Sequence, residues 1–408
     1  MIKTLFLIVP LLVQAESLKS LLEYSMGSNS LVISKTLNEK AKTKELESKQ
    51  NAYFPTLDAG MFYRNMKERS LGIPGVTYSG YAKISLDIYD GGYKSSLVKQ
   101  KNEELKSSRF ETEALKKSLS LSIIQDFYTA KSLNATLVAR EDAKKSLQAQ
   151  LSRMEKFYAA KVATKDDVDR LRAAFDTNIY EIESIKFQIL SIKQDLELKV
   201  GKKITSLDNS TFRENIQNEY EKTDVINSMM AQKESILNAA DSLSSIYYPQ
   251  IRVEDTYSLY GYENSDRTHP GGVDRQNVLL LSANIRLYDN ATLKRSQEVV
   301  LLNAQALNSE INYKNREQKM QLTLAKSRIL TSKTKIKSAL SALVSAKSAF
   351  VSVEKKYAAG VVDNVVYLDA LTAKTNAVAL YETSKNDLEI AYAIYYYYSG
   401  KNVEEYLQ

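Results

Sequence analysis

The chain has 408 residues, of which only 13 are glycine and 5 are proline, so long elements with few interruptions are expected. It contains no cysteine, which excludes a disulfide framework, thiolate metal sites, a catalytic thiol and the lipidated cysteine of a bacterial lipoprotein. The formal net charge is +7, and basic residues are interleaved with acidic ones, which favours a solvated helical surface over a nucleic-acid-binding surface.

The N-terminus has the three parts of a secretory signal peptide. Lys3 supplies a positive charge, residues 5–13 are apolar, and small residues end at Ala15 before Glu16. We therefore predict that residues 1–15 are a signal peptide. The alternative, a membrane anchor, needs roughly 20 apolar residues, about twice the run that is present. No later stretch is expected to span a membrane as a helix, so the mature chain is either soluble outside the cytoplasm or inserted in a membrane by strands.

The first half predicts a helix, a pair of strands, a very long helix and a shorter one. Pro55 ends the first helix, because proline cannot continue a helix and pushes the residue before it to an extended conformation. Neither glycine nor proline interrupts the sequence from Tyr93 to Tyr158, which predicts a helix of about 66 residues, on the order of 100 Å long. The predicted elements are a helix over 17–51 with a break near 27–29, an antiparallel hairpin with strands near 57–64 and 83–88, a helix over 93–158 and a helix from about 164 to 200.

The second half repeats this pattern. A Tyr-Ala-Ala motif at residues 158–160 recurs at 357–359, which is 199 residues later, and Pro249 repeats Pro55 behind two aromatic residues. The elements predicted here are an irregular connection over 202–222, a helix over 225–246, strands near 251–262 and 279–287, and a long helix over 291–357. We predict two structural repeats, residues 16–205 and 206–408, with the same order of helix, hairpin, long helix and helix.

Four strands are too few to close a barrel or to hide their edges in lipid, whereas three copies of the chain supply 12 strands. A 12-stranded barrel is closed and wide enough for a channel. The 27 tyrosines suit interfacial girdles, although Tyr395 to Tyr398 are expected to pack against helices. The predicted outward faces contain Leu57, Ala59, Met61, Tyr63, Ile84 and Leu279, and the side chains predicted to face water are Arg64, Lys83, Asp87 and Arg286.

The whole mature chain resembles the TolC family of outer membrane efflux proteins. The resemblance rests on Pro55 and Pro249 after the upper helices, on the Asp-Gly-Gly motif at residues 90–92, and on the two Tyr-Ala-Ala turns with Gly360. It implies a mixed, mostly helical membrane protein. The implied assembly is a homotrimer in which a long antiparallel coiled-coil α-helical barrel in the periplasm is capped by a 12-stranded transmembrane β-barrel in the outer membrane, with four strands per protomer. The implied function is the exit duct of a tripartite efflux pump or type I secretion system, with an inner-membrane pump and a periplasmic adaptor (membrane fusion) protein as partners.

The resemblance also implies a gate at the periplasmic helix turns, formed by Asp167, Tyr357 and Asp369. In the family, inward aspartates and bonds between helices hold the tunnel closed until the adaptor opens it. Here Val366 replaces one expected aspartate and Val362 replaces an expected arginine. Residues expected to contact the adaptor are Val162, Ala163, Gly360 and Val361.

Each gate residue is also suited to an ordinary structural role, and this alternative remains open. Asp167 is also suited to capping a helix, Asp369 to a solvated helix face and Tyr357 to packing a helix seam. The one histidine, His269, falls in a Pro/Gly-rich loop expected at the surface, and no phosphate-binding or metal-binding spacing occurs, so no enzyme activity, cofactor or metal is expected.

The alternative function is a secreted coiled-coil structural or adaptor protein without a pore. Such a protein has no need of two amphipathic hairpins at matched positions. An extracellular enzyme is a more distant possibility.

Overall fold

The computed structural model describes residues 17–67, 75–216, 220–263 and 273–408. The predicted signal peptide and His269 lie outside these residues. The chain divides into two compact units, which we call the sheet unit and the turn unit. The sheet unit is Thr36–Glu111 with Val225–Lys314, and the turn unit is Met1–Lys35, Thr112–Asp224 and Asn315–Gln408. Each unit therefore draws on both halves of the sequence.

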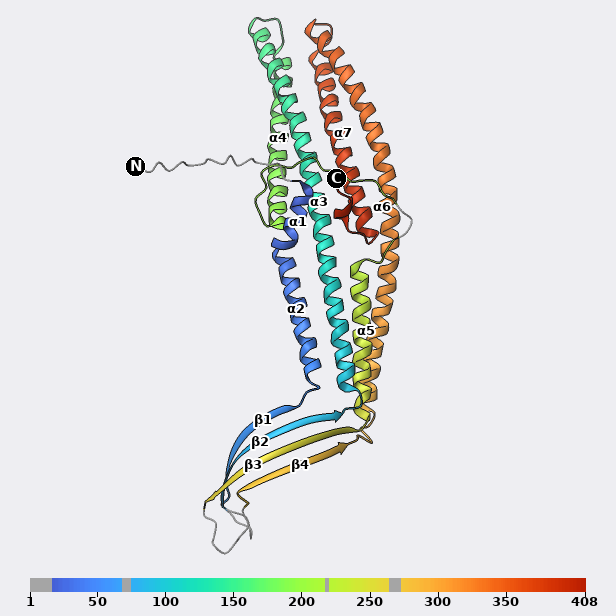
Figure 1. Cartoon of the computed structure of the whole chain (residues 1–408). Helices are drawn as coiled ribbons and strands as arrows, with labels where there is room; N and C mark the ends of the chain where they lie inside the picture. The colour runs from blue at the N-terminus through green and yellow to red at the C-terminus, as the bar shows by residue number, and fades with distance from the viewer. Residues whose placement is uncertain (1–16, 68–74, 217–219, 264–272) are drawn as a thin grey trace, which may run out of the picture. The chain divides into compact units, whose positions relative to one another are not determined.

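The sheet unit contains one antiparallel sheet with its strands in the order β1-β2-β3-β4 (Figure 1). The strands are β1 (Thr56–Asn65), β2 (Val76–Tyr89), β3 (Gln250–Glu263) and β4 (Arg275–Asn284). Both predicted hairpins are confirmed, and β2 pairs with β3 to join them. Each of the outer strands β1 and β4 keeps one row of backbone N–H and C=O groups without a strand partner in this described sheet.

The register of the sheet places the predicted apolar residues on a single face. Leu57 lies opposite Ile84, which is aligned through β3 with Leu279. Leu57 is 73% exposed and Leu279 is 72% exposed, whereas Thr77 and Ser79 on the opposite face are buried. The sheet therefore curls around its polar face, since side chains on a concave surface cover one another. The fourth strand ends earlier than predicted, so Arg286 follows β4 and does not lie within it.

Both hairpins are followed by a turn that needs left-handed backbone. Gly91 and Gly92 have φ of 68° and 89° before α3 (Tyr93–Ala159). At the equivalent point before α6 (Thr292–Ala358), Asn290 and Ala291 have φ of 55° and 60°. Only glycine adopts this conformation without a steric penalty, so the second junction carries strain that the first avoids.

The helices of the sheet unit form a layer in which α3 has a neighbour on each side. Its Lys101 contacts Glu45 of α2 (Ser30–Asn51) at 3.2 Å, and its Ser107 hydroxyl donates to the Ser228 carbonyl of α5 (Asp224–Ser244) at 3.1 Å. In the turn unit, the predicted break between the first two helices is confirmed, because α1 (Leu18–Ser28) is followed by Asn29, whose side-chain oxygen accepts hydrogen bonds from the backbone amides of Leu31 and Val32 in α2.

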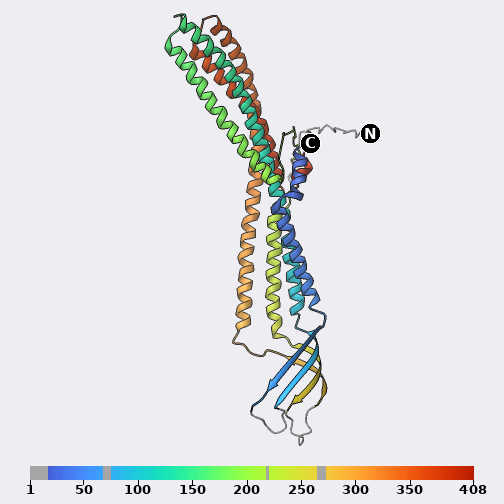
Figure 2. The same ribbon diagram turned by 90° about the vertical axis from the view of Figure 1, so that its left-hand side faces the viewer.

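The turn unit contains two helical hairpins that lie side by side in both views (Figures 1 and 2). One joins α3 to α4 (Lys165–Val200), and the other joins α6 to α7 (Asn364–Tyr398). Their core is apolar and rich in tyrosine, as predicted for the C-terminal tyrosine run. Its fully buried members include Leu18, Ile123, Phe127, Tyr395 and Tyr396.

Tyrosines also fix the irregular connection between the two halves. The Tyr128 hydroxyl donates to the Ser210 carbonyl at 2.9 Å, and the Phe212 amide donates to the Glu389 carboxylate at 2.7 Å. Phe212 also forms an isolated β-bridge with Leu407, so the C-terminal residues lie along the connection. The connection is therefore irregular in conformation but held at several points.

The described fold confirms the predicted class, a mostly helical chain with an antiparallel four-stranded sheet, and the predicted ends of the two long helices are correct to within one residue. The prediction that no later helix could span a membrane is wrong by length and composition. One 18-residue stretch of α6 is long enough and apolar enough to cross a membrane. The sequence reasoning counted continuous apolar runs, whereas the apolar residues of α6 are spread among serines and alanines. A single such window is weak evidence for a membrane span. The repeat boundary at 205/206 stays a prediction.

Candidate gate at the helix turns

The two Tyr-Ala-Ala turns have the same backbone hydrogen bonds, shifted by 199 residues. In the first, the Lys161 amide donates to the Tyr158 carbonyl at 2.9 Å and the Val162 amide to the Phe157 carbonyl at 2.9 Å. The second turn has the same two bonds from Gly360 and Val361, at 3.1 and 2.9 Å. This is the Schellman helix ending, whose first residue past the helix is left-handed. Gly360 has φ of 75°, but Lys161 has φ of 62°, so the first turn lacks the favoured glycine.

Asp167 closes the start of α4 through a capping box. Its carboxylate accepts bonds from the Thr164 amide at 3.2 Å and from the Thr164 hydroxyl at 2.7 Å, while its own amide donates back to the Thr164 hydroxyl oxygen. Asp167 therefore caps α4, which is the structural role that the sequence offered as the alternative. Its second carboxylate oxygen is left for another donor.

That donor comes from the other helix turn. The Asn364 side-chain amide donates to the Asp167 carboxylate at 3.1 Å and to the Asp167 backbone carbonyl at 3.2 Å. Asn364 is the first residue of α7 and is 3% exposed. One side chain thus joins the beginnings of α4 and α7, which are 197 residues apart in sequence.

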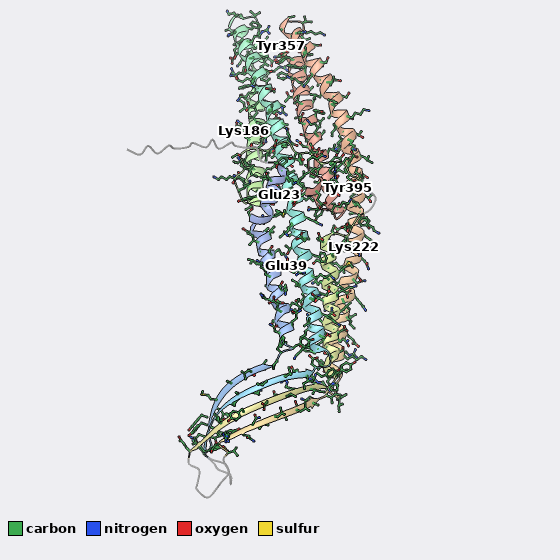
Figure 3. The ribbon with its side chains drawn as sticks, in the orientation of Figure 1. Glu23, Glu39, Lys186, Lys222, Tyr357 and Tyr395 are labelled. Carbon is green, nitrogen blue, oxygen red and sulfur yellow. The ribbon has the colours of Figure 1, made fainter. Side chains whose placement is uncertain are left out.

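Tyr357 lies in an aromatic cluster beneath the second turn, where Figure 3 labels it. Its ring stacks on the ring of Tyr367, with the centroids 4.7 Å apart, and the Arg153 guanidinium lies 6.0 Å from its centroid. Burial raises the pKa of Tyr357. No hydrogen bond joins Tyr357 to Asp167 in the described part of the chain. The two residues of the expected gating pair therefore belong to the same contact region between the helix turns without being bonded to each other.

Arg153 makes a second link between the hairpins. It projects from α3, donates to the Ala358 carbonyl at 3.2 Å, and stacks over Phe157 with its guanidinium carbon 5.1 Å from the ring centroid. The contact places a cation beside the last carbonyls of α6, where the helix dipole favours positive charge. A guanidinium is therefore present at the turns although Val362 replaces the expected arginine.

The seam between α3 and α7 contains a buried tyrosine hydroxyl beside polar side chains. The Tyr367 hydroxyl is fully buried and lies near the side chains of Ser146 and Gln150. Burial raises the pKa of Tyr367 to about 12.

The remaining predicted site residues lie at the surface of the turns. Val162 is 76% exposed and Val361 is 70% exposed, Gly360 is exposed and Ala163 is half-buried. Asp369 is exposed on α7, which places its carboxylate in contact with solvent in a single chain. Sequence reasoning missed Asn364, Arg153 and Tyr367. Only the position of Asn364 directly after Asp363 at a helix start could have drawn attention to it, as a second polar residue at the cap.

Two helices of the turn unit carry exposed apolar residues opposite their buried seams. On α4, Tyr180 and Phe187 are 75% and 72% exposed and lie seven residues apart. On α6, Val344 and Val351 are 62% and 49% exposed and lie seven residues apart, and Leu330 nearer the N-terminus of the helix is 66% exposed. Heptad spacing on an outer face is the pattern of a helix that packs against another helix.

The described residues contain no group of three or more His, Cys, Asp or Glu side chains that could hold a metal ion.

Comparisons with known proteins agree with this fold. Residues 28–202 match the model of a family described as outer membrane efflux protein. No curated protein matches the chain at a significant level.

Three solved structures illustrate the likeness. The outer membrane protein VceC of Vibrio cholerae is 14% identical with a TM-score of 0.83, and the match covers 95% of this chain and 96% of that one. The CmeC outer membrane channel of Campylobacter jejuni is 11% identical with a TM-score of 0.83, covering 94% and 85%. A membrane protein from Pseudomonas aeruginosa is 14% identical with a TM-score of 0.84, covering 94% and 93%. At these identities the likeness establishes the fold, and with the family match it confirms the resemblance stated from the sequence.

Proposed function

We propose that this chain, which has the fold of the outer membrane efflux proteins, forms a trimeric outer membrane channel. The channel is the exit duct of an efflux pump or type I secretion system. Three chains supply 12 strands for a closed β-barrel in the outer membrane, and the helices of the turn unit lie in the periplasm.

The observation that carries this proposal is that each unit presents surface suited to pairing with another copy of the chain. This surface consists of the outer strands in the sheet unit and of exposed apolar helix faces in the turn unit. In the sheet unit, β1 and β4 are the outer strands, and the convex face carries apolar side chains such as Met61, which is 89% exposed. In the turn unit, α4 and α6 bear the exposed apolar rows that include Phe187 and Leu330. Two different edges on one chain favour a head-to-tail interface, and such an interface generates a ring when its rotation closes.

The polar face of the sheet fits the inside of a pore. Arg252 donates to Asp87 at 2.6 Å on this face, and Lys83 lies 3.6 Å from Glu254. A water-filled barrel keeps such charges inside and apolar residues outside. A secreted coiled-coil protein without a pore has no use for this division of faces, which therefore favours the channel.

Detergent extraction tests the channel. We expect the protein to fractionate with outer membranes, to migrate as a heat-modifiable trimer, and to conduct ions in a planar bilayer. A soluble monomer in buffer would rule the channel out.

Partners are the finer part of the proposal. The exposed turn residues Val162, Ala163, Gly360 and Val361 are proposed to contact a periplasmic adaptor protein that links the channel to an inner-membrane pump. Since the chain has no cysteine, the single variants Val162→Cys and Val361→Cys carry one defined attachment point each. A cysteine-directed cross-linker in whole cells should couple both to the adaptor. Leu198→Cys is the matched control, because Leu198 is 78% exposed at the opposite end of α4. Equal cross-linking from all three positions would contradict the assignment.

A further inference from the structure

We propose that Tyr260, Tyr262 and Asp274 form a binding site for quaternary ammonium cations on the polar face of the sheet. The site lies at the end of the sheet where β3 turns into β4, away from the helices. The inference rests on the proposed function in one respect, because the channel makes this face the wall of its pore and makes such cations a class of solute that the pore binds.

The polar face of the sheet changes character along its strands. Near the helices it carries ion pairs, such as Arg252 with Asp87 at 2.6 Å. Near the hairpin turns it carries aromatic rings, since residues at every second position of a strand share a face. The aromatic residues that the register places there are Phe62, Tyr81, Tyr260 and Tyr262. Ion pairs and rings therefore occupy different levels of one surface.

Tyr260 and Tyr262 form a pair, whereas Tyr81 is used within the sheet. A Cβ at Gly60 would meet the Tyr81 hydroxyl at 2.6 Å, so the Tyr81 ring lies over the glycine of the neighbouring strand. The rings of Tyr260 and Tyr262 are 6.3 Å apart between centroids and nearly parallel, with 9° between their planes. The Tyr262 hydroxyl donates to the Val273 carbonyl at 2.9 Å, which holds its ring across the hairpin.

The spacing of the two rings suits a cation. A cation is attracted to an aromatic ring when it lies within about 6 Å of the ring centroid. Since the centroids of Tyr260 and Tyr262 are 6.3 Å apart, one ammonium group can lie within that distance of both. Both side chains are partly exposed, so a cation reaches them from solvent.

Asp274 supplies a negative charge beside the rings. The Tyr260 amide donates to the Asp274 carbonyl at 2.8 Å, so the two residues lie opposite each other across the hairpin. The Asp274 side chain is exposed, and its charge lies close enough to the Tyr262 hydroxyl to act on it. Arg64 shares this face but belongs to β1, which is two strand spacings, roughly 10 Å, from β3. The charge that adjoins the ring pair is therefore negative.

These groups match a quaternary ammonium better than a metal ion or a primary amine. A quaternary ammonium carries apolar methyl groups and a diffuse charge, and it packs on aromatic faces without hydrogen bonds. A metal ion or a primary amine needs several oxygen atoms around it, whereas this site offers one carboxylate. The two rings and the carboxylate supply the contact area and the charge that a quaternary ammonium uses.

Saturation-transfer NMR on the whole protein in detergent measures the binding, with choline as the probe and detergent alone as the blank. We expect transfer to the choline methyl groups. We expect none above the blank for the neutral analogue in which a carbon atom replaces the nitrogen. Tyr260→Leu combined with Tyr262→Leu should weaken choline binding about tenfold, and Asp274→Asn should weaken it about threefold.

The matched controls lie on the opposite face of the same strand. Tyr257→Leu removes a tyrosine that is 45% exposed on the apolar face, and Glu263→Gln removes a carboxylate at the end of β3. Both variants should bind choline as the wild type does. Circular dichroism and heat-modifiable migration verify that every variant is folded and assembled.

The outcomes separate this inference from the proposed function. Equal choline binding by the wild type and the double leucine variant overturns the site. Equal binding of choline and its neutral analogue overturns the assignment to cations, and a loss in Tyr257→Leu as large as in the double variant overturns the assignment to the polar face. None of these results depends on a current. Absence of current from the wild-type trimer overturns the channel, and with it the place of the site in a pore.

Discussion

Replacement of Leu330 by serine should weaken the trimer without unfolding the protomer. Leu330 is 66% exposed on α6 and belongs to the row that we assign to the contact with the next copy. Full burial of a leucine side chain is worth about 1.5–3 kcal/mol. Two thirds of that is about 1–2 kcal/mol per interface, or about 3–6 kcal/mol for three interfaces. This corresponds to a loss of roughly 10²- to 10⁴-fold in the association constant of the trimer.

Leu330→Met is the control, because it keeps the apolar surface and the approximate volume. The assay is the trimer fraction in detergent across a dilution series, measured as mass, with circular dichroism to verify that helix content is unchanged. Leu330→Ser should dissociate at higher protein concentration than both wild type and Leu330→Met. Identical dilution curves for the three proteins would show that this face of α6 lies outside the interface and would refute the assignment.

Three further substitutions test contacts and backbone conformation within the protomer. Tyr128→Phe removes the bond to the Ser210 carbonyl and should lower stability by about 1–2 kcal/mol, seen as a lower melting temperature in detergent, since it leaves a buried carbonyl unpaired. Lys161→Gly should stabilise the first turn by up to about 1 kcal/mol, because the left-handed residue becomes glycine; an unchanged or lower melting temperature argues against strain there. Burial raises the pKa of Glu389 above its ordinary value of 4.5, so the folded form holds this proton more tightly than the unfolded chain. The stability that protonated Glu389 contributes is fully present below about pH 4.5 and is lost as the pH rises through the pKa of the folded form. Glu389→Gln should therefore raise the melting temperature more at pH 8 than at pH 4. An equal shift at both pH values would contradict the burial effect.

The amino-acid sequence was sufficient to predict the order and lengths of the main elements of the fold. The absence of glycine and proline from Tyr93 to Tyr158 predicted the length of α3, because nothing in that stretch could end a helix. The alternation around Leu57 and Ile84 predicted the apolar face of the sheet, since register and face are linked in any strand. Periodic patterns of this kind depend on local geometry, so they are visible without tertiary information.

The contact between the two helix turns was not predictable in the same way. Asn364 was indistinguishable from a cap residue, since capping and cross-linking both use a polar side chain at a helix start. Its partner Asp167 lies 197 residues away, and only folding brings the two together. Arg153 was hidden for a similar reason, because its position in a helical repeat of charged residues indicates a solvated face. The left-handed backbone at Asn290 and Ala291 was not predicted either.

The most direct test of the central claim is the mass and conductance of the protein extracted from outer membranes. The account predicts a particle containing three chains that inserts in a planar bilayer and opens ohmic currents, with Leu330→Ser reducing the trimer fraction. A single chain that stays in solution, or a trimer that never conducts, would contradict it.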